Sequence, residues 1–250
     1  MHTRQQEPVT LYFWPTHNGF KIAIFLEEAG IPYRLEMIDI ENGAQFAPDF
    51  LKIAPNNKMP VLIDPEGPDG KPITIFESAA ILLYLGRKAG AFLGKTEAER
   101  SVVEQWLIWQ VANVGPNFGQ IHHFADFAPE KIPYAIDRFK KEGRRLYGVL
   151  DRRLADHEWV AGDYSVADMA IFPWTRPWRI HGVLKGDFPH FERWFQAMND
   201  RPAVQRALRA GGEITAALEA KRTERARRMD LEAERAKAAA ATLPGSPNAL

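Results

Sequence analysis

Strand-forming runs in this 250-residue chain are confined to the part before Glu77, and this uneven distribution limits the fold more than any other feature. Four runs have the length and composition of β-strands: Val9–Phe13, Tyr33–Ile40, Val61–Asp64 and Ile73–Ile75. A helical pattern separates the first two, which predicts a parallel βαβ unit. A turn rich in Pro, Gly and Asp joins the last two, which predicts a hairpin. We therefore expect a four-stranded mixed sheet.

Helical patterns complete this first part of the chain. The helix expected at Phe20–Ala29 has Gly30 as its C-terminal stop signal. A short helix is expected at Phe46–Ile53, and Ser78–Lys88 is expected to close the unit. The order βαβ-α-ββα predicts an α/β domain over residues 8–89.

The following part of the chain favours helices only. Thr96–Glu99 has the sequence of a capping box that opens a long helix, and Gly115-Pro116 should break or kink that helix. Ser165 is expected to be an N-cap, with Asp168 as a capping acid rather than a catalytic one. Further helices are expected at Pro133–Leu154 and Phe188–Met198.

These patterns predict an all-helical domain over residues 96–210. Residues 211–250 form a charged tail, which we expect to be either helical or disordered.

Composition narrows the classes of function. Lys plus Arg and Asp plus Glu both number 32, and a net charge of zero disfavours a nucleic-acid partner. No apolar run has membrane-spanning length and no secretory signal is visible, so we expect a cytoplasmic protein without a membrane partner. The chain has no cysteine, so any thiol chemistry needs a thiol that arrives with a ligand.

Two segments suggest a site for a small zwitterionic peptide. In Asn56–Leu62 a proline opens a strand, and a cis bond at Pro60 would turn the backbone of Met59 outward, where a peptide can pair as an added strand. Glu77 and Ser78 open a helix, where an acid can hold an ammonium group and a hydroxyl can hold a carboxylate.

Together the motifs resemble the cytosolic glutathione transferase superfamily, and most of all its bacterial Nu class of disulfide-bond reductases. The similarity spans roughly residues 8–210, and the segments that carry it are Leu11–Gly19, Pro55–Pro60, Phe76–Ser78, Gly115–Phe124 and Ile132–Arg138. The resemblance implies a thioredoxin-like N-terminal domain, an all-α C-terminal domain, and glutathione bound in reduced or oxidised form as co-substrate.

The resemblance also implies the substrate-binding residues. The Met59 backbone would pair with the cysteinyl unit of glutathione, Glu77 would hold the γ-glutamyl ammonium group, and Ser78 would hold its carboxylate. Lys58 and Gln45 would reach the other end of the peptide. Arg138, from the helical domain, would contact glutathione within its own subunit or across a dimer.

For the sulfur contact, the Nu-type pattern points to Thr16 and Asn18 as the catalytic residues. A hydroxyl or amide donor beside the sulfur stabilises thiolate over thiol, and the helix start near Gly19 adds positive potential. Tyr12 is the rival, because tyrosine-type transferases carry Tyr-Phe near this point, but it lies within the strand.

We carry two hypotheses of function. The first is a glutathione-dependent enzyme whose bound thiolate reduces a small disulfide, with conjugation to electrophiles as a sister activity; by resemblance it would be a homodimer. The second is a non-catalytic regulatory or scaffolding module with the same cleft, motivated by the tail. His122-His123 do not predict a metal site, because no third ligand has a convincing spacing. A phosphate loop is also absent, so no nucleotide cofactor is expected.

Overall fold

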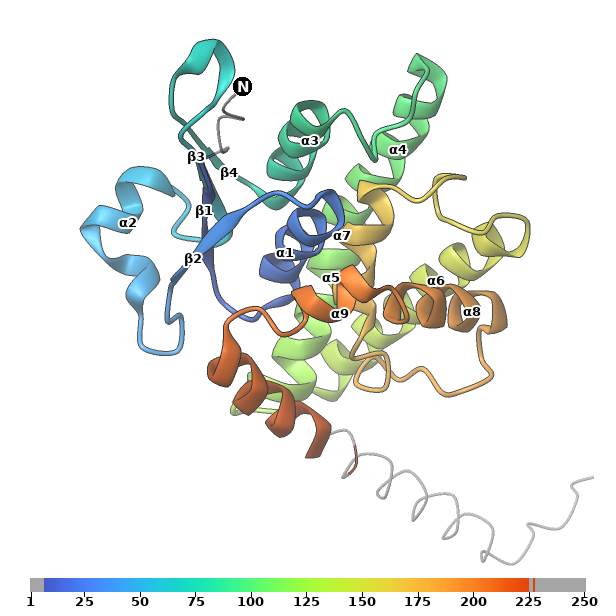
Figure 1. Ribbon diagram of the computed structural model, residues 1–250. Coiled ribbons are helices and arrows are strands. Elements are labelled where there is room, and N and C mark those ends of the chain that lie inside the picture. Colours follow the sequence, from blue (N-terminus) through green and yellow to red (C-terminus); the bar gives the residue numbers. More distant parts are fainter. Residues whose placement is uncertain (1–6, 225–226, 228–250) are drawn as a thin grey trace, which may run out of the picture.

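A four-stranded mixed sheet forms one side of the molecule in the computed structural model, which describes residues 7–224 and residue 227 (Figure 1). The strand order is β2-β1-β3-β4, with β1 parallel to β2 and antiparallel to β3. The strands are β1 (Val9–Phe13), β2 (Tyr33–Met37), β3 (Val61–Asp64) and β4 (Ile73–Phe76). The predicted mixed sheet is therefore confirmed, although β2 ends three residues earlier than expected.

Alternation along β1 explains why both faces of the sheet are covered. Val9, Leu11 and Phe13 are buried on the face that packs against α1 (His17–Ala29) and α3 (Ser78–Ala89). On the opposite face a smaller cluster joins Trp14, Met59 and Val61 to residues of α2 (Pro48–Ile53), which follows the 3₁₀ turn η1 (Ala44–Phe46). Figure 1 shows α2 on the outer side and α1 on the inner side.

The helical part begins with the predicted capping box. Thr96 and Glu99 exchange their bonds at the start of α4 (Glu97–Trp109). The helical run does not break at Gly115-Pro116, because the π-helical turn η3 (Gln110–Val114) leads directly into α5 (Gly115–His122); the kink, which was the other predicted outcome, stays a prediction. Pro116 lies in the first turn of α5, where a proline is tolerated, and the wider preceding turn makes room for it. A second π-helical turn, η4 (His123–Phe127), ends this segment.

Three further helices follow the sequence prediction within about two residues: α6 (Pro133–Ala155), α7 (Val166–Thr175), for which only the start was predicted, and α8 (Pro189–Asn199). A last short helix, α9 (Pro202–Ala207), was not predicted. Ser165 caps α7, and the buried Asp168 accepts hydrogen bonds from Ser165, Val160 and Trp194, which is the expected structural role. None of the helices within residues 7–224 is long and apolar enough to cross a bilayer.

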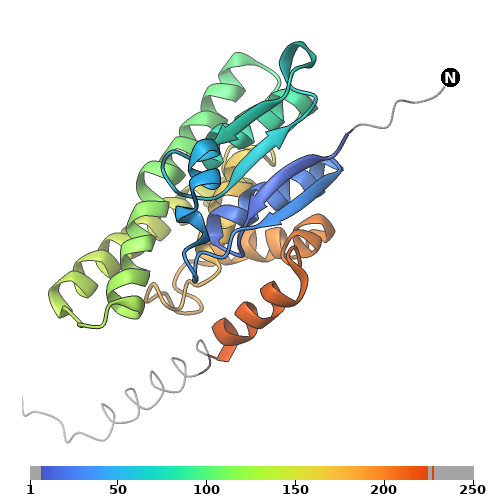
Figure 2. The ribbon, with the colours of Figure 1, turned by 90° about the vertical axis from the view of Figure 1, so that its left-hand side faces the viewer.

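Helix α1 joins the two parts of the molecule. It packs on α3 and on α7 and α9 of the helical part. Its Phe20 ring also packs on Phe13 of β1, and Figure 2 shows the helix behind the sheet. At its C-terminal end, Glu28 pairs with Arg201 at 2.6 Å and Glu27 pairs with Arg206 at 2.6 Å. Because α1 also begins at the pocket described below, both parts of the chain fix the position of that pocket.

The described part of the charged tail is helical over residues 212–224. Residue 227 is helical too, and the rest of the predicted 211–250 segment lies outside the described residues. The bounds predicted for the two domains, 8–89 and 96–210, stay a prediction; α3 ends at Ala89 and α4 begins at Glu97.

Candidate active site

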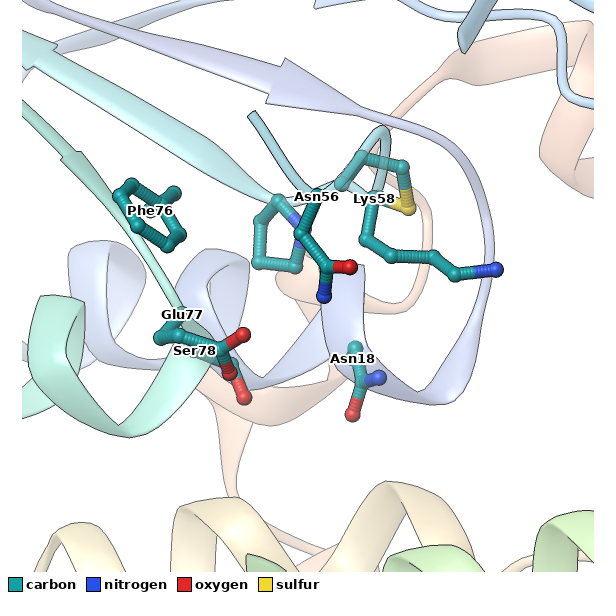
Figure 3. Close-up of a pocket in the computed structure, with 8 residues that line it drawn as sticks. Asn18, Asn56, Lys58, Phe76, Glu77 and Ser78 are labelled. Carbon is teal, nitrogen blue, oxygen red and sulfur yellow. The ribbon is translucent and has the colours of Figure 1, made fainter. Parts of the chain in front are cut away.

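A pocket of about 270 Å³ opens where the starts of α1, β3 and α3 meet (Figure 3). It is lined by Asn18, Asn56, Lys58, Met59, Pro60, Phe76, Glu77 and Ser78. The amide of Asn56 and the side chains of Glu77 and Ser78 point into the hollow, and Asn18 lies opposite them. The volume is near the lower end of the range for small-molecule sites. One compact polar group, or one unit of a peptide, fits it.

The rim of the pocket is the entry to β3. The Met59–Pro60 bond is cis, as expected. The ladder between β1 and β3 begins with the pair Tyr12 and Val61, so Met59 precedes the paired part of the strand while still lining the pocket. An extended peptide can therefore lie beside the Met59 backbone.

Glu77 and Ser78 hold the opposite wall at the start of α3. Glu77 has φ 71° and ψ 116°, a conformation that costs a non-glycine residue about 1–3 kcal/mol and is typically retained at functional sites. Its side chain is exposed in the pocket, whereas Ser78 is only 6% exposed. The first backbone N–H groups of α3 are free of partners within the helix, so this wall combines a carboxylate with an anion-binding helix start.

Thr16 and Asn18 lie at the start of α1, which begins three residues earlier than predicted. Thr16 is the N-cap: its hydroxyl accepts from the Gly19 backbone N–H at 3.2 Å and donates to the Met59 sulfur at 3.4 Å. Asn18 lines the pocket directly, and Thr16 stands behind Met59.

Trp174 fixes the orientation of the Asn18 amide. The indole N–H of Trp174 donates to Asn18 Oδ1 at 2.9 Å, which leaves the Nδ2 donors of Asn18 for a ligand. The ring lies over Gly115 and Gly119, where a Cβ atom would come within 3.7 Å of it. The position of Trp174 in the sequence carries no signal for this polar contact.

A buried lysine lies behind Ser78. Lys21 is 1% exposed, and its Nζ donates to Ser78 Oγ at 3.2 Å and to Gln110 Oε1 at 2.5 Å. Burial lowers the pKa of Lys21 to about 7, and the nearby Glu77 carboxylate raises it in part. The sequence does not predict that Lys21 is buried, because both of its partners come from distant parts of the chain, 57 and 89 positions away.

Three histidine rings pack beside the start of α1. His17 packs between His122 and Trp174 with tilted rings, and His122 Nε2 lies 3.2 Å from His181 Nε2. Burial holds the pKa of His17 and of His181 well below the usual value, so both are neutral at pH 7. Within residues 7–224, no group of three or more His, Cys, Asp or Glu side chains is placed to hold a metal ion.

Of the remaining predicted residues, only Lys58 lines the pocket, where it is exposed. Gln45 and Arg138 lie outside the lining: Gln45 is in η1, where its Nε2 donates to the Ile40 carbonyl at 3.4 Å. Arg138 is exposed on α6, close enough to Glu142 to lower the pKa of that carboxyl. Asn56 and Phe76 belong to the quoted motifs but were not singled out, and both line the pocket.

The last described helix supports the loop between β1 and α1. Arg222 donates to the Pro15 carbonyl at 2.7 Å, and Glu219 pairs with both Arg222 and Arg176. Leu218 packs against the cluster that contains Trp14 and Met59.

A βαβ-α-ββα sheet unit, a helical partner, a cis proline at the rim and an acid–serine pair at a helix start together define a glutathione transferase. Family models for the N-terminal and C-terminal domains of glutathione S-transferase match residues 7–87 and 116–202. The chain therefore belongs to the glutathione S-transferase family.

Individual relatives narrow this class. The chain is 47% identical to the disulfide-bond oxidoreductase YfcG of Escherichia coli over 202 residues, which cover 80% of this chain and 94% of the relative. A Pseudomonas putida glutathione transferase, solved with one glutathione disulfide per subunit, has a TM-score of 0.79 and 39% identity, covering 84% of this chain and 95% of that one. A Burkholderia graminis glutathione transferase, solved with two glutathione molecules per subunit, has a TM-score of 0.79 and 41% identity, covering 83% and 90%.

Proposed function

We propose that this protein is a glutathione-dependent disulfide-bond oxidoreductase of the Nu-class type. The observation that carries the proposal is that Asn18 shares one pocket with Glu77 and Ser78. A hydrogen-bond donor for the ligand sulfur and a wall that can bind a zwitterion therefore face the same ligand. The relatives support it, because one is named a disulfide-bond oxidoreductase and others were solved with glutathione or its disulfide.

The residues divide the tripeptide between them. Glu77 binds the γ-glutamyl ammonium group, Ser78 and the start of α3 bind the carboxylate, and the Met59 backbone pairs with the cysteinyl unit. Lys58 and Gln45 serve the glycyl end. Arg138 meets a further carboxylate when a second glutathione or a glutathione disulfide is present.

The chemistry is thiol–disulfide exchange between bound partners. The thiolate of bound glutathione attacks one sulfur of the substrate disulfide, forms a mixed disulfide and releases the other half as a thiolate, which takes a proton from water. A second glutathione thiolate attacks the mixed disulfide, so glutathione disulfide leaves and the substrate has gained two electrons. The chain supplies no sulfur nucleophile, since it contains no cysteine.

Asn18 and Thr16 stabilise the thiolate. Moving the pKa of a thiol from about 8.5 to about 6.5 requires roughly 2.7 kcal/mol, and two hydrogen bonds to a charged acceptor, each about 1.5–3 kcal/mol, supply it. Asn18 donates from Nδ2, and the Thr16 hydroxyl turns its proton from the Met59 sulfur to the ligand. We therefore prefer Thr16 and Asn18 to Tyr12 as the residues that contact the sulfur, because Tyr12 lies within β1.

We further propose a cytoplasmic homodimer that takes small disulfides, with electrophiles as secondary substrates. The alternative, a non-catalytic module that keeps the cleft, is less favoured because the relatives that match most of this chain include a named oxidoreductase.

Turnover of 2-hydroxyethyl disulfide with glutathione tests the proposal. We expect wild-type turnover, and a loss of kcat of tenfold or more in Asn18→Ala, with a smaller loss in Thr16→Ala. Thr74→Ala, an exposed position on β4, is the matched control and should not change the rate. A wild-type protein that binds glutathione but converts neither disulfides nor electrophiles would establish the non-catalytic module instead.

A further inference from the structure

Lys21 occupies a buried position, where a charged lysine lowers the stability of the fold. It lies in the middle of α1 between the buried residues Phe20 and Ile22, and it is itself 1% exposed. Its ammonium group donates to two neutral partners, Ser78 Oγ and Gln110 Oε1, and neither offsets its charge. A buried charge that lacks a carboxylate in direct contact is destabilising, so its presence needs a reason beyond packing.

Ser78 connects this buried charge to the pocket. Its oxygen accepts from Lys21 on the inner side, and its side chain lines the pocket on the outer side (Figure 3). Because the oxygen already accepts a hydrogen bond from a cation, the hydroxyl proton is directed outward and is more strongly polarised. A group that binds there must be an acceptor, and an anionic acceptor gains most.

A negative and a positive charge lie side by side at the pocket wall. Glu77 presents a carboxylate at the pocket wall, and Lys21 places a positive charge behind the adjacent Ser78. This arrangement matches an α-amino acid head group, whose ammonium and carboxylate sit on one carbon atom. We propose that Lys21 is a positioning residue that recognises the α-carboxylate of a γ-glutamyl ligand through the hydroxyl of Ser78. The proposal rests on the glutathione-dependent function above and deepens it.

A bound carboxylate would also change the protonation of Lys21. The groups that face its Nζ are Ser78 and Glu77 from the start of α3 and Gln110 from η3, and of these only Glu77 is titratable. On α1 itself, His17 lies one turn earlier and packs on Trp174. The pKa of Lys21 is about 7, so above that pH the lysine is mostly neutral in the free protein. A carboxylate that arrives beside Ser78 draws a proton onto it.

Calorimetry with two ligands tests the proposal. S-methylglutathione keeps the γ-glutamyl head but has no thiol to ionise. Its counterpart, in which a 4-aminobutanoyl group replaces γ-glutamyl, lacks only the α-carboxylate. We expect wild-type protein to prefer the first ligand by tenfold or more, and Lys21→Met to lose at least tenfold for the first while changing less than twofold for the second. At pH 8, in buffers of different ionisation enthalpy, the wild type should take up a proton with the first ligand only, and Lys21→Met with neither.

A second variant keeps the test decisive if Lys21→Met does not fold. Gln110→Glu retains the lysine and gives it a competing carboxylate, so it should reduce the preference for S-methylglutathione at least fivefold and abolish the proton uptake.

Four results would overturn the assignment. Equal losses for both ligands in Lys21→Met would mean a purely structural role. An unchanged preference in Gln110→Glu would contradict the electrostatic account. If the wild type binds S-methylglutathione no more tightly than its counterpart, the role of Lys21 is refuted but the proposed function is not. If the wild type binds neither ligand, both the role of Lys21 and the proposed function are refuted.

Discussion

Replacing Lys21 with methionine should make the protein more stable at neutral pH. Burial moves the pKa of Lys21 from 10.5 to about 7. At about 1.36 kcal/mol for each unit, the folded state loses roughly 5 kcal/mol of stability while the unfolded chain holds its proton. Methionine has a similar length and no charge, so it removes this loss.

Part of this gain in stability is lost because Ser78 and Gln110 lose the hydrogen bonds that Lys21 donates. Gln110 is fully buried, and an unsatisfied buried amide costs about 1–3 kcal/mol. Ser78 lines the pocket, where water replaces the lysine at a cost of about 1 kcal/mol or less. The net expectation is a gain of about 2 kcal/mol at pH 7, which corresponds to a rise in Tm of about 4–8 °C for a chain of this size.

The pH dependence gives the sign of the effect. Between about pH 7 and pH 10.5 the unfolded chain binds the lysine proton and the folded protein does not, so wild-type stability rises with pH across this range. The advantage of Lys21→Met should therefore shrink between pH 7 and pH 9.5 in urea unfolding curves. Lys52→Met, at a lysine whose side chain is 75% exposed, is the control and should shift stability by less than about 0.5 kcal/mol. A Lys21→Met protein that is less stable than wild type by an amount independent of pH would refute the reasoning.

Three further changes probe the site and its surroundings. Trp174→Phe keeps the ring over Gly115 but frees the Asn18 amide to turn, so the pKa of bound glutathione, followed by thiolate absorbance, should rise by about 0.5–1 unit; an unchanged pKa would mean that Asn18 is oriented by other contacts. Glu77→Gln should weaken glutathione binding about tenfold or more in calorimetry because the ammonium loses its counter-charge, and unaltered affinity would contradict that role. Burial lowers the pKa of His181, so below pH 6.5 the unfolded chain binds a proton that the folded protein does not, and wild-type stability should fall by up to about 1.4 kcal/mol per pH unit on this account. His181→Asn should flatten that slope in urea titrations between pH 7 and pH 5, and a parallel slope would contradict the assignment.

Local patterns predicted the sheet and most helices because the deciding interactions are close in sequence. Gly30 ends α1 in the left-handed conformation, and Thr96 with Glu99 caps α4, so each signal acts within one turn of the residue that carries it. The break offered for Pro116 does not occur, because the outcome there depends on the π-helical turn that precedes α5. Such a turn has no sequence signature of comparable strength.

The site was predictable only where it coincides with a motif. Glu77, Ser78 and Met59 lie in segments whose order along the chain suggests a peptide-binding edge, and the pocket contains all three. The residues that lie behind the pocket wall belong to no such motif. Lys21 and Gln110 are 89 positions apart, and Trp174 and Asn18 are 156 apart, so the contacts that orient the donors exist only once both domains have packed.

The contact between Arg222 and the Pro15 carbonyl joins positions 207 residues apart, and Leu218 presses on the same loop from behind. The turn that carries Thr16 is therefore supported by residues that do not line the pocket. Shortening the protein ahead of Leu218 would remove both contacts, so we expect the placement of Thr16 to change while Glu77 and Ser78, on α3, keep theirs.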